Sequence, residues 1–75
     1  MRLVNALPGV WMIVTGFEGG ERFSDRLTQH GLYPGDRARI LRMAPLRGPL
    51  LVEVAGREIA IGRAIAQKIL VELAE

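Results

Sequence analysis

The residues of this chain that could do chemistry are mainly arginines. Four of them fall within eleven residues that contain no acidic side chain: Arg37, Arg39, Arg42 and Arg47. A guanidinium group offers a planar set of N–H donors that suits carboxylates and phosphates. Three interpretations of this segment stay open: a solvated strand face, a docking surface for an acidic partner, or a patch that binds nucleic acid.

Aromatic residues bear on the nucleic-acid interpretation, because single-strand binders stack bases on aromatic side chains placed among their basic residues. The aromatic residues here are Trp11, Phe17, Phe23 and Tyr33, and none lies within the arginine segment. We therefore expect no nucleic-acid partner. Tyr33, at the start of a predicted turn, is the aromatic residue that we expect to be displayed. It joins the four arginines as a candidate partner-binding residue.

Metal ligands are scarce, since the chain has one histidine and no cysteine. Glu21 and Asp25 lie four residues apart on a predicted helix, so their carboxylates could converge on a cation, although acids in a first helical turn also favour the helix dipole. His30 falls on the apolar stripe of Phe23 and Leu27, where we expect a partly buried, hydrogen-bonded side chain. We expect no required cofactor, and binding of a divalent transition metal stays open.

Catalytic groups are also lacking, and we expect that the chain is not an enzyme. Ser24, Thr15 and Thr28 have only His30 to activate them, and no third residue to orient that histidine is evident. The glycines at 16, 19 and 20 lack the lysine and the spacing of a phosphate-binding loop. Any nucleotide chemistry would belong to a partner.

Length and composition indicate one folded domain over residues 1–75, with 49% hydrophobic and 24% charged residues and a net charge of +2. The absence of cysteine excludes a disulfide scaffold. Asn5 and Pro8-Gly9 interrupt the apolar start, which argues against a signal peptide. The longest apolar run, residues 10–14, is far shorter than the roughly 20 residues of a membrane span. We expect no membrane insertion, and the lack of cysteine is compatible with a reducing compartment.

The elements that must position these residues are five short strands and one short amphipathic helix. We predict strands at residues 10–17, 36–44, 50–54, 57–61 and 69–73, a helix at 21–30, and a helical turn near 62–67. Turns are expected at Gly31, Pro34, Gly35, Pro45, Gly48 and Pro49. Met12 and Met43 are interpreted as core residues. An all-β barrel, closed or half-closed, suits these strands better than a flat sheet with exposed edges.

The second predicted strand breaks the simple alternation of apolar and polar residues. Ala38 and Ile40 share one face, but Leu41 and Met43 share the other. A bulge at Ile40-Leu41 would shift the period by one residue and turn all four inward. The arginines at 37, 39 and 42 would then all face solvent.

Several motifs resemble those of the FeoA family. They are Val14-Thr15-Gly16-Phe17, Arg26-Leu27, Gly31-Leu32, Pro34-Gly35, Ala44-Pro45-Leu46, Gly48-Pro49, and the ending from Ile59-Ala60-Ile61 to Ile69-Leu70-Val71-Glu72. The resemblance covers nearly the whole chain and implies a five-stranded SH3-like barrel. The same barrel occurs as the C-terminal domain of diphtheria toxin repressor-type regulators. This chain resembles the stand-alone form, because no DNA-binding helix-turn-helix precedes the barrel.

The resemblance also implies a function. FeoA proteins are small cytoplasmic components of bacterial ferrous iron uptake, thought to act on the cytoplasmic GTPase region of the membrane transporter FeoB. We therefore expect an accessory protein that works by protein–protein interaction. The alternative is a metal-sensing module comparable to the repressor domains. The sequence leaves the oligomeric state open, a homo-oligomer included.

Overall fold

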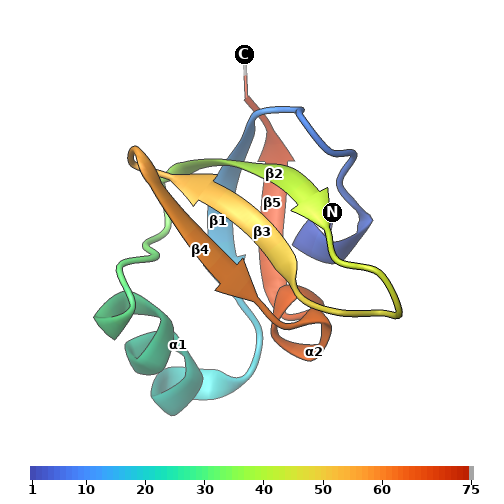
Figure 1. Cartoon of the computed structure of the whole chain (residues 1–75). Coiled ribbons are helices and arrows are strands. Elements are labelled where there is room, and N and C mark those ends of the chain that lie inside the picture. The colour runs from blue at the N-terminus through green and yellow to red at the C-terminus, as the bar shows by residue number, and fades with distance from the viewer. Residues whose placement is uncertain (75) are drawn as a thin grey trace.

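The computed structural model describes residues 1–74, and these form one curved antiparallel sheet with the strand order β4-β3-β2-β1-β5 (Figure 1). The strands are β1 (Met12–Phe17), β2 (Arg37–Met43), β3 (Leu50–Val54), β4 (Arg57–Ile61) and β5 (Ile69–Leu73). The helices are the 3-10 helix η1 (Leu3–Asn5), α1 (Gly20–Gln29) and α2 (Arg63–Ala66). The five strands, the helix after β1 and the helical turn before β5 are therefore confirmed.

Most element boundaries agree with the prediction, and the differences have local causes. β1 starts at Met12 rather than at residue 10, because Val10 still belongs to a turn in which its N–H donates to Leu7 O at 3.3 Å. α1 runs from Gly20 to Gln29, one residue earlier at each end than predicted. Gly31 takes φ 88°, the left-handed conformation that ends helices.

The turn before β2 has the predicted form. Asp36 donates its N–H to Tyr33 O at 3.1 Å, and Gly35 takes φ 95°. A positive φ at the third residue of a four-residue turn is the type II geometry, which favours glycine. Pro34-Gly35 therefore directs the chain into β2, where the arginines begin.

The predicted bulge lies in β2. Ile40 pairs with Val52, but Arg42 pairs with Leu51, so Leu41 has no partner residue on β3. Ala38 and Ile40 are buried and Met43 packs against the core, as predicted. The inward placement of Leu41 is wrong. It is half-exposed and outside the core cluster, because it is the extra residue of the bulge.

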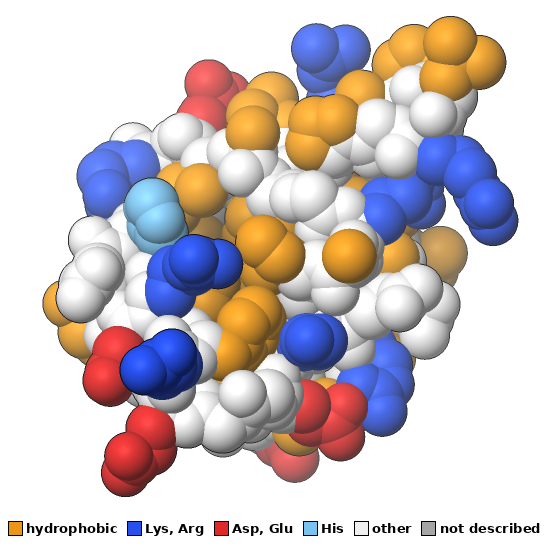
Figure 2. Space-filling model, turned by 90° about the horizontal axis from the view of Figure 1, so that it is seen from below, with side chains coloured by type: hydrophobic (Ala, Val, Ile, Leu, Met, Phe, Trp, Pro, Cys, Tyr) orange, Lys and Arg blue, Asp and Glu red, His pale blue; other side chains and the backbone are white. Residues whose placement is uncertain are grey.

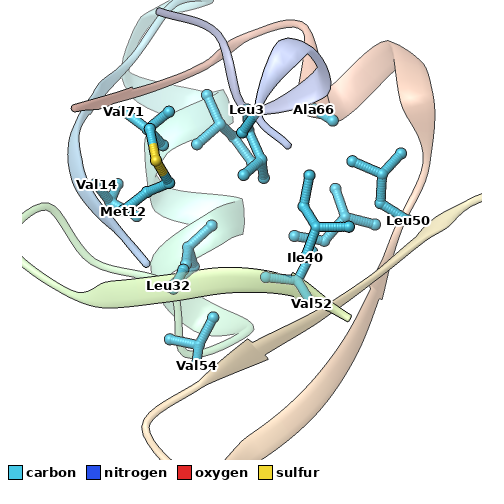
Figure 3. Close-up of a cluster of buried hydrophobic side chains, with 14 of the residues drawn as sticks. Leu3, Met12, Val14, Leu32, Ile40, Leu50, Val52, Val54, Ala66 and Val71 are labelled. Atoms are coloured by element: carbon cyan, nitrogen blue, oxygen red, sulfur yellow. The ribbon is translucent and has the colours of Figure 1, made fainter. Parts of the chain in front are cut away.

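Fifteen buried hydrophobic residues fill the space that the curved sheet encloses, and Figure 3 shows many of them pointing toward one another. Leu50, Val52 and Val54 of β3 all face this core. Met12 is 1% exposed, which confirms the prediction that it is a core residue. The sequence prediction missed Leu3, which is also 1% exposed and enters the core from η1. The N-terminal segment is thus part of the barrel.

Backbone and side-chain bonds hold this segment in place. The backbone of Arg2 pairs with that of Leu70 in an isolated antiparallel β-bridge, and Val71 donates its N–H to Met1 O at 2.8 Å. The Arg2 guanidinium donates to Gln67 O at 2.7 Å and forms a salt bridge with Glu18. Hydrogen bonding to Arg2 lowers the pKa of the Glu18 carboxyl from its ordinary value, and the same bond raises the pKa of Arg2.

Leu3→Ala should lower the free energy of unfolding by about 2–4 kcal/mol, because it leaves a cavity in the core. Urea denaturation followed by circular dichroism measures this loss. The control is Leu7→Ala, at a side chain that is 71% exposed, which should change stability by no more than about 0.5 kcal/mol. Equal effects of the two substitutions would contradict the assignment of Leu3 to the core.

The Glu18 carboxyl should make stability depend on pH. Since its pKa is lowered in the folded state, its contribution is present above the ordinary carboxyl pKa and is lost as pH falls through the folded-state value. The difference in unfolding free energy between the wild type and Glu18→Gln should therefore be largest near neutral pH and vanish in acid. Urea titrations at several pH values measure it.

Candidate functional site

The candidate site lies on the outer face of β2, where Trp11 contacts two arginines. The guanidinium carbons of Arg39 and Arg37 lie 4.8 Å and 5.6 Å from the centroid of the Trp11 ring. A cation placed over an aromatic face within about 6 Å is attracted by the ring, by roughly 0.5–1 kcal/mol at exposed sites. We call Trp11, Arg37 and Arg39 the arginine–tryptophan surface.

The register of the two strands explains why these residues meet. β1 and β2 pair antiparallel, with Met12 opposite Ala38 and Ile13 opposite Arg37. The same register, continued by one residue, sets Trp11 opposite Arg39. The sequence prediction missed Trp11 because it lies 26 residues before Arg37 in the chain. Only the alignment of the two predicted strands could have indicated the contact.

The three arginines of β2 differ in whether they form a salt bridge. Arg39 donates from Nε to Glu53 Oε1 at 2.7 Å, across the β2–β3 pair. Within residues 1–74, neither Arg37 nor Arg42 takes part in a salt bridge, and both side chains are exposed. Arg39 is therefore held in one orientation, while the other two present free cationic groups able to bind carboxylates or phosphates.

The other partner-binding candidates lie at opposite ends of β2. Tyr33 stands before the strand, is 51% exposed, and donates its N–H to Asp36 Oδ2 at 2.8 Å. Arg47 follows the strand in the β2–β3 loop, where it and Leu46 both take φ 59°. The five predicted residues thus do not form one patch. Arg37 and Arg39 are brought together, Arg42 lies beyond the bulge, and Tyr33 and Arg47 are separate.

The metal candidates Glu21 and Asp25 are both exposed on α1. Among residues 1–74, no three His, Cys, Asp or Glu side chains are grouped so that they could hold a metal ion. These two carboxylates do not fit a resident transition metal, which prefers imidazole or thiolate ligands. In Figure 1, α1 and β2 lie at opposite sides of the barrel, so the acidic start of the helix is not beside the arginines.

The expectation for His30 is wrong. The side chain is exposed rather than partly buried, and no hydrogen bond of its ring occurs among the described residues. α1 ends at Gln29, and His30 is the capping residue with φ −84° and ψ 1°. The backbone has left the helical path there, so His30 does not continue the buried stripe of Leu27.

No helix among the described residues has the length and apolar character needed to cross a membrane.

Comparison with known proteins identifies relatives over nearly the whole chain. Residues 1–73 match the family model of the FeoA domain. The chain is 36% identical over 73 residues to "Putative Fe(2+) transport protein A" of Methanocaldococcus jannaschii, covering 97% of this chain and 87% of that protein. The solution structure of iron(II) transport protein A from Clostridium thermocellum is 29% identical, with a TM-score of 0.89 over 97% of this chain and 45% of that chain.

More distant structures share the fold. The zinc complex of FeoA from Stenotrophomonas maltophilia, an SH3 domain protein, is 22% identical with a TM-score of 0.77, covering 96% of this chain and 89% of that one. The manganese regulator SloR is 20% identical with a TM-score of 0.83, and the match covers 97% of this chain but 34% of SloR. The fold is SH3-like, as expected, and the repressor-type regulators share it. The chain belongs to the FeoA family.

Proposed function

We propose that this iron-transport accessory protein is cytoplasmic and docks on the cytoplasmic GTPase region of a FeoB-type transporter. The arginine–tryptophan surface, together with Arg42, provides the contact. The single observation that carries the proposal is Trp11 set beside two guanidinium groups on an outer strand face. Tryptophan and arginine are the residue types that dominate the energetics of protein–protein interfaces.

The geometry of this surface favours binding for two further reasons. Glu53 already holds Arg39 in place, so less side-chain freedom is lost when a partner binds. Arg37 and Arg42 are exposed cations, which attract an acidic partner and orient its approach. A merely solvated face would not need a half-buried tryptophan among its arginines.

A nucleic-acid partner is less well supported, although Trp11 supplies the aromatic residue that the arginine segment lacks. The ring is half-buried and already contacts two guanidinium groups, so its faces are less available to a stacking base. The metal-sensing alternative has no donor set of three grouped residues behind it among residues 1–74. Titration calorimetry with ferrous and other divalent ions distinguishes this alternative from docking.

The docking proposal is tested by titrating the protein against the isolated GTPase domain, in each nucleotide state, and against the intact transporter. Arg37→Ser should weaken binding at least tenfold, because it removes an exposed cation beside Trp11. Arg22→Ser, which removes an exposed arginine of α1, is the matched control and should leave affinity within twofold. The proposal would be contradicted if the wild type bound neither the GTPase domain nor the intact transporter in any nucleotide state.

The substitutions should leave the barrel folded. Arg42→Ser should change the free energy of unfolding by no more than about 0.5 kcal/mol, as exposed positions do. Arg37→Ser should cost about 0.5–1 kcal/mol, because it removes a cation–π contact with Trp11. Arg39→Ser should cost about 0.5–1.5 kcal/mol, because it removes the Glu53 pair and a cation–π contact.

Trp11 is the only tryptophan, so its fluorescence reports on this surface directly. The wavelength of maximal Trp11 emission should shift in Arg39→Ser and stay unchanged in Arg42→Ser. Urea titrations of the same variants measure their free energies of unfolding. Unfolding of the Arg42→Ser variant would show that the face assignment is wrong.

A further inference from the structure

The two edges of the sheet are treated differently. The edge at β5 is covered by the start of the chain, through the Arg2–Leu70 bridge and the bond from Val71 N–H to Met1 O. The other edge is β4, and within residues 1–74 it pairs only with β3. An uncovered strand edge exposes unpaired N–H and C=O groups and can template the addition of another strand.

The β3–β4 turn determines which backbone groups face this free edge. Ala55 and Gly56 take φ 52° and φ 76°, the geometry of a two-residue type I′ hairpin, so Val54 and Arg57 form the closing hydrogen-bonded pair. Hydrogen-bonded and non-bonded pairs alternate along an antiparallel ladder. Ile59 and Ile61 therefore bond to β3, whereas the N–H and C=O groups of Glu58 and Ala60 point outward. Both of these residues are exposed.

An apolar groove runs beside this edge, between α1, β4 and α2. Its volume is about 150 Å³, comparable to an apolar cavity that accepts a benzene-sized molecule. The side chains that line it include Leu27, His30, Leu32, Ile59, Ile61 and Ile65. Figure 2 shows hydrophobic side chains in a hollow on this side of the molecule, with basic side chains around it.

The groove and the free edge are placed so that one added strand could contact both. Side chains of directly opposite residues in a sheet point to the same face. In a strand added to β4, the residues opposite Glu58 and Ala60 would make the backbone hydrogen bonds. The residue between them, opposite Ile59, would direct its side chain to the face where Ile59 lines the groove. One aliphatic side chain would thus enter the groove while the backbone pairs at the edge.

The rim of the groove is basic. His30 lines it and is exposed, and Arg57 lies at the start of β4 with Nη2 donating to Gly31 O at 3.1 Å. A Cβ atom at Gly31 would lie 2.1 Å from Arg57 Nη2, so only glycine lets this arginine tie the end of α1 to β4. The charge at the mouth suits a partner segment with carboxylates beside its aliphatic residue.

We propose that the β4 edge and this groove bind an extended segment of another protein by strand addition, the segment carrying one branched aliphatic residue flanked by acidic residues. Main-chain bonds to Glu58 and Ala60 give affinity, and the groove and its basic rim select the sequence. This surface is separate from the arginine–tryptophan surface. A negative result for docking through the arginine–tryptophan surface would therefore leave strand addition at β4 untouched, and the reverse also holds.

The probe for the test is the blocked peptide acetyl-Glu-Asp-Thr-Leu-Thr-Asp-Glu-amide, titrated into the isotope-labelled chain and followed by NMR. Amide shifts should concentrate in residues 57–62 and 27–32. Replacing the leucine of the peptide by aspartate should weaken binding at least tenfold. Arg42→Ser, a matched loss of one arginine on the other surface, should leave the affinity within twofold.

Two changes test the backbone bonds. Ala60→Pro removes an N–H that faces the free edge and leaves the β3 pairing intact, so it should weaken binding at least tenfold. If this variant fails to fold, a peptide N-methylated at the two threonine amides tests the same bonds on the wild-type chain and should also bind at least tenfold more weakly.

Three outcomes would overturn the proposal. They are no shifts at millimolar peptide, unchanged affinity after removal of the backbone bonds, and shifts at residues 58–60 that depend on protein concentration without peptide. The last result would assign the edge to a second copy of this chain.

Discussion

The extra residue at Leu41 is the constraint on which the rest of the molecule depends. Without it, the period-two alternation of a strand would place Ile40 and Met43 on opposite faces, and one of them would be lost to the core. The bulge lets both face the interior while Arg39 and Arg42 remain outside. On the β1 side of β2, the Ile40 carbonyl accepts the N–H of Gly9 at 2.7 Å, which holds the loop before β1 against this strand. The packing of the core against β2 and the outward placement of its arginines thus both follow from one inserted residue.

The arginine face acquires its character from the neighbouring strands rather than from its own residues. Trp11, directly before β1, lies on one side, and Glu53 of β3 lies on the other. Arg39, between them, is oriented by both contacts, whereas Arg37 and Arg42 remain free of salt bridges within residues 1–74. This division gives a surface with an ordered centre and free cations around it. It is a suitable basis for binding, and it contains no group able to act as a nucleophile.

The sheet ends differently on its two sides, because within residues 1–74 the start of the chain covers the β5 edge and nothing pairs with the outer edge of β4. At β5, the first residues of the chain satisfy the edge and send Leu3 into the core, so that edge contributes to stability. At β4, the outward groups of Glu58 and Ala60 stay exposed beside an apolar groove. An open strand edge offers backbone hydrogen bonds, and the apolar groove beside it offers a surface that a partner side chain can bury.

The sequence by itself determined the strands, the helix, the turns and the bulge, because these depend on the periodicity of neighbouring residues and on the φ preferences of glycine and proline. Pro34-Gly35, Gly31 and the broken alternation around Leu41 are local signals, and the structure agrees with each of them. The bulge at Thr15 in the β1–β5 ladder and the core role of Leu3 carried no such signal. The tertiary structure alone decided that Trp11 meets Arg39, that His30 stays exposed, and that β4 has no second partner strand within residues 1–74. Those features depend on the register between distant segments and on how the ends of the sheet are covered, and no local pattern of residues encodes either.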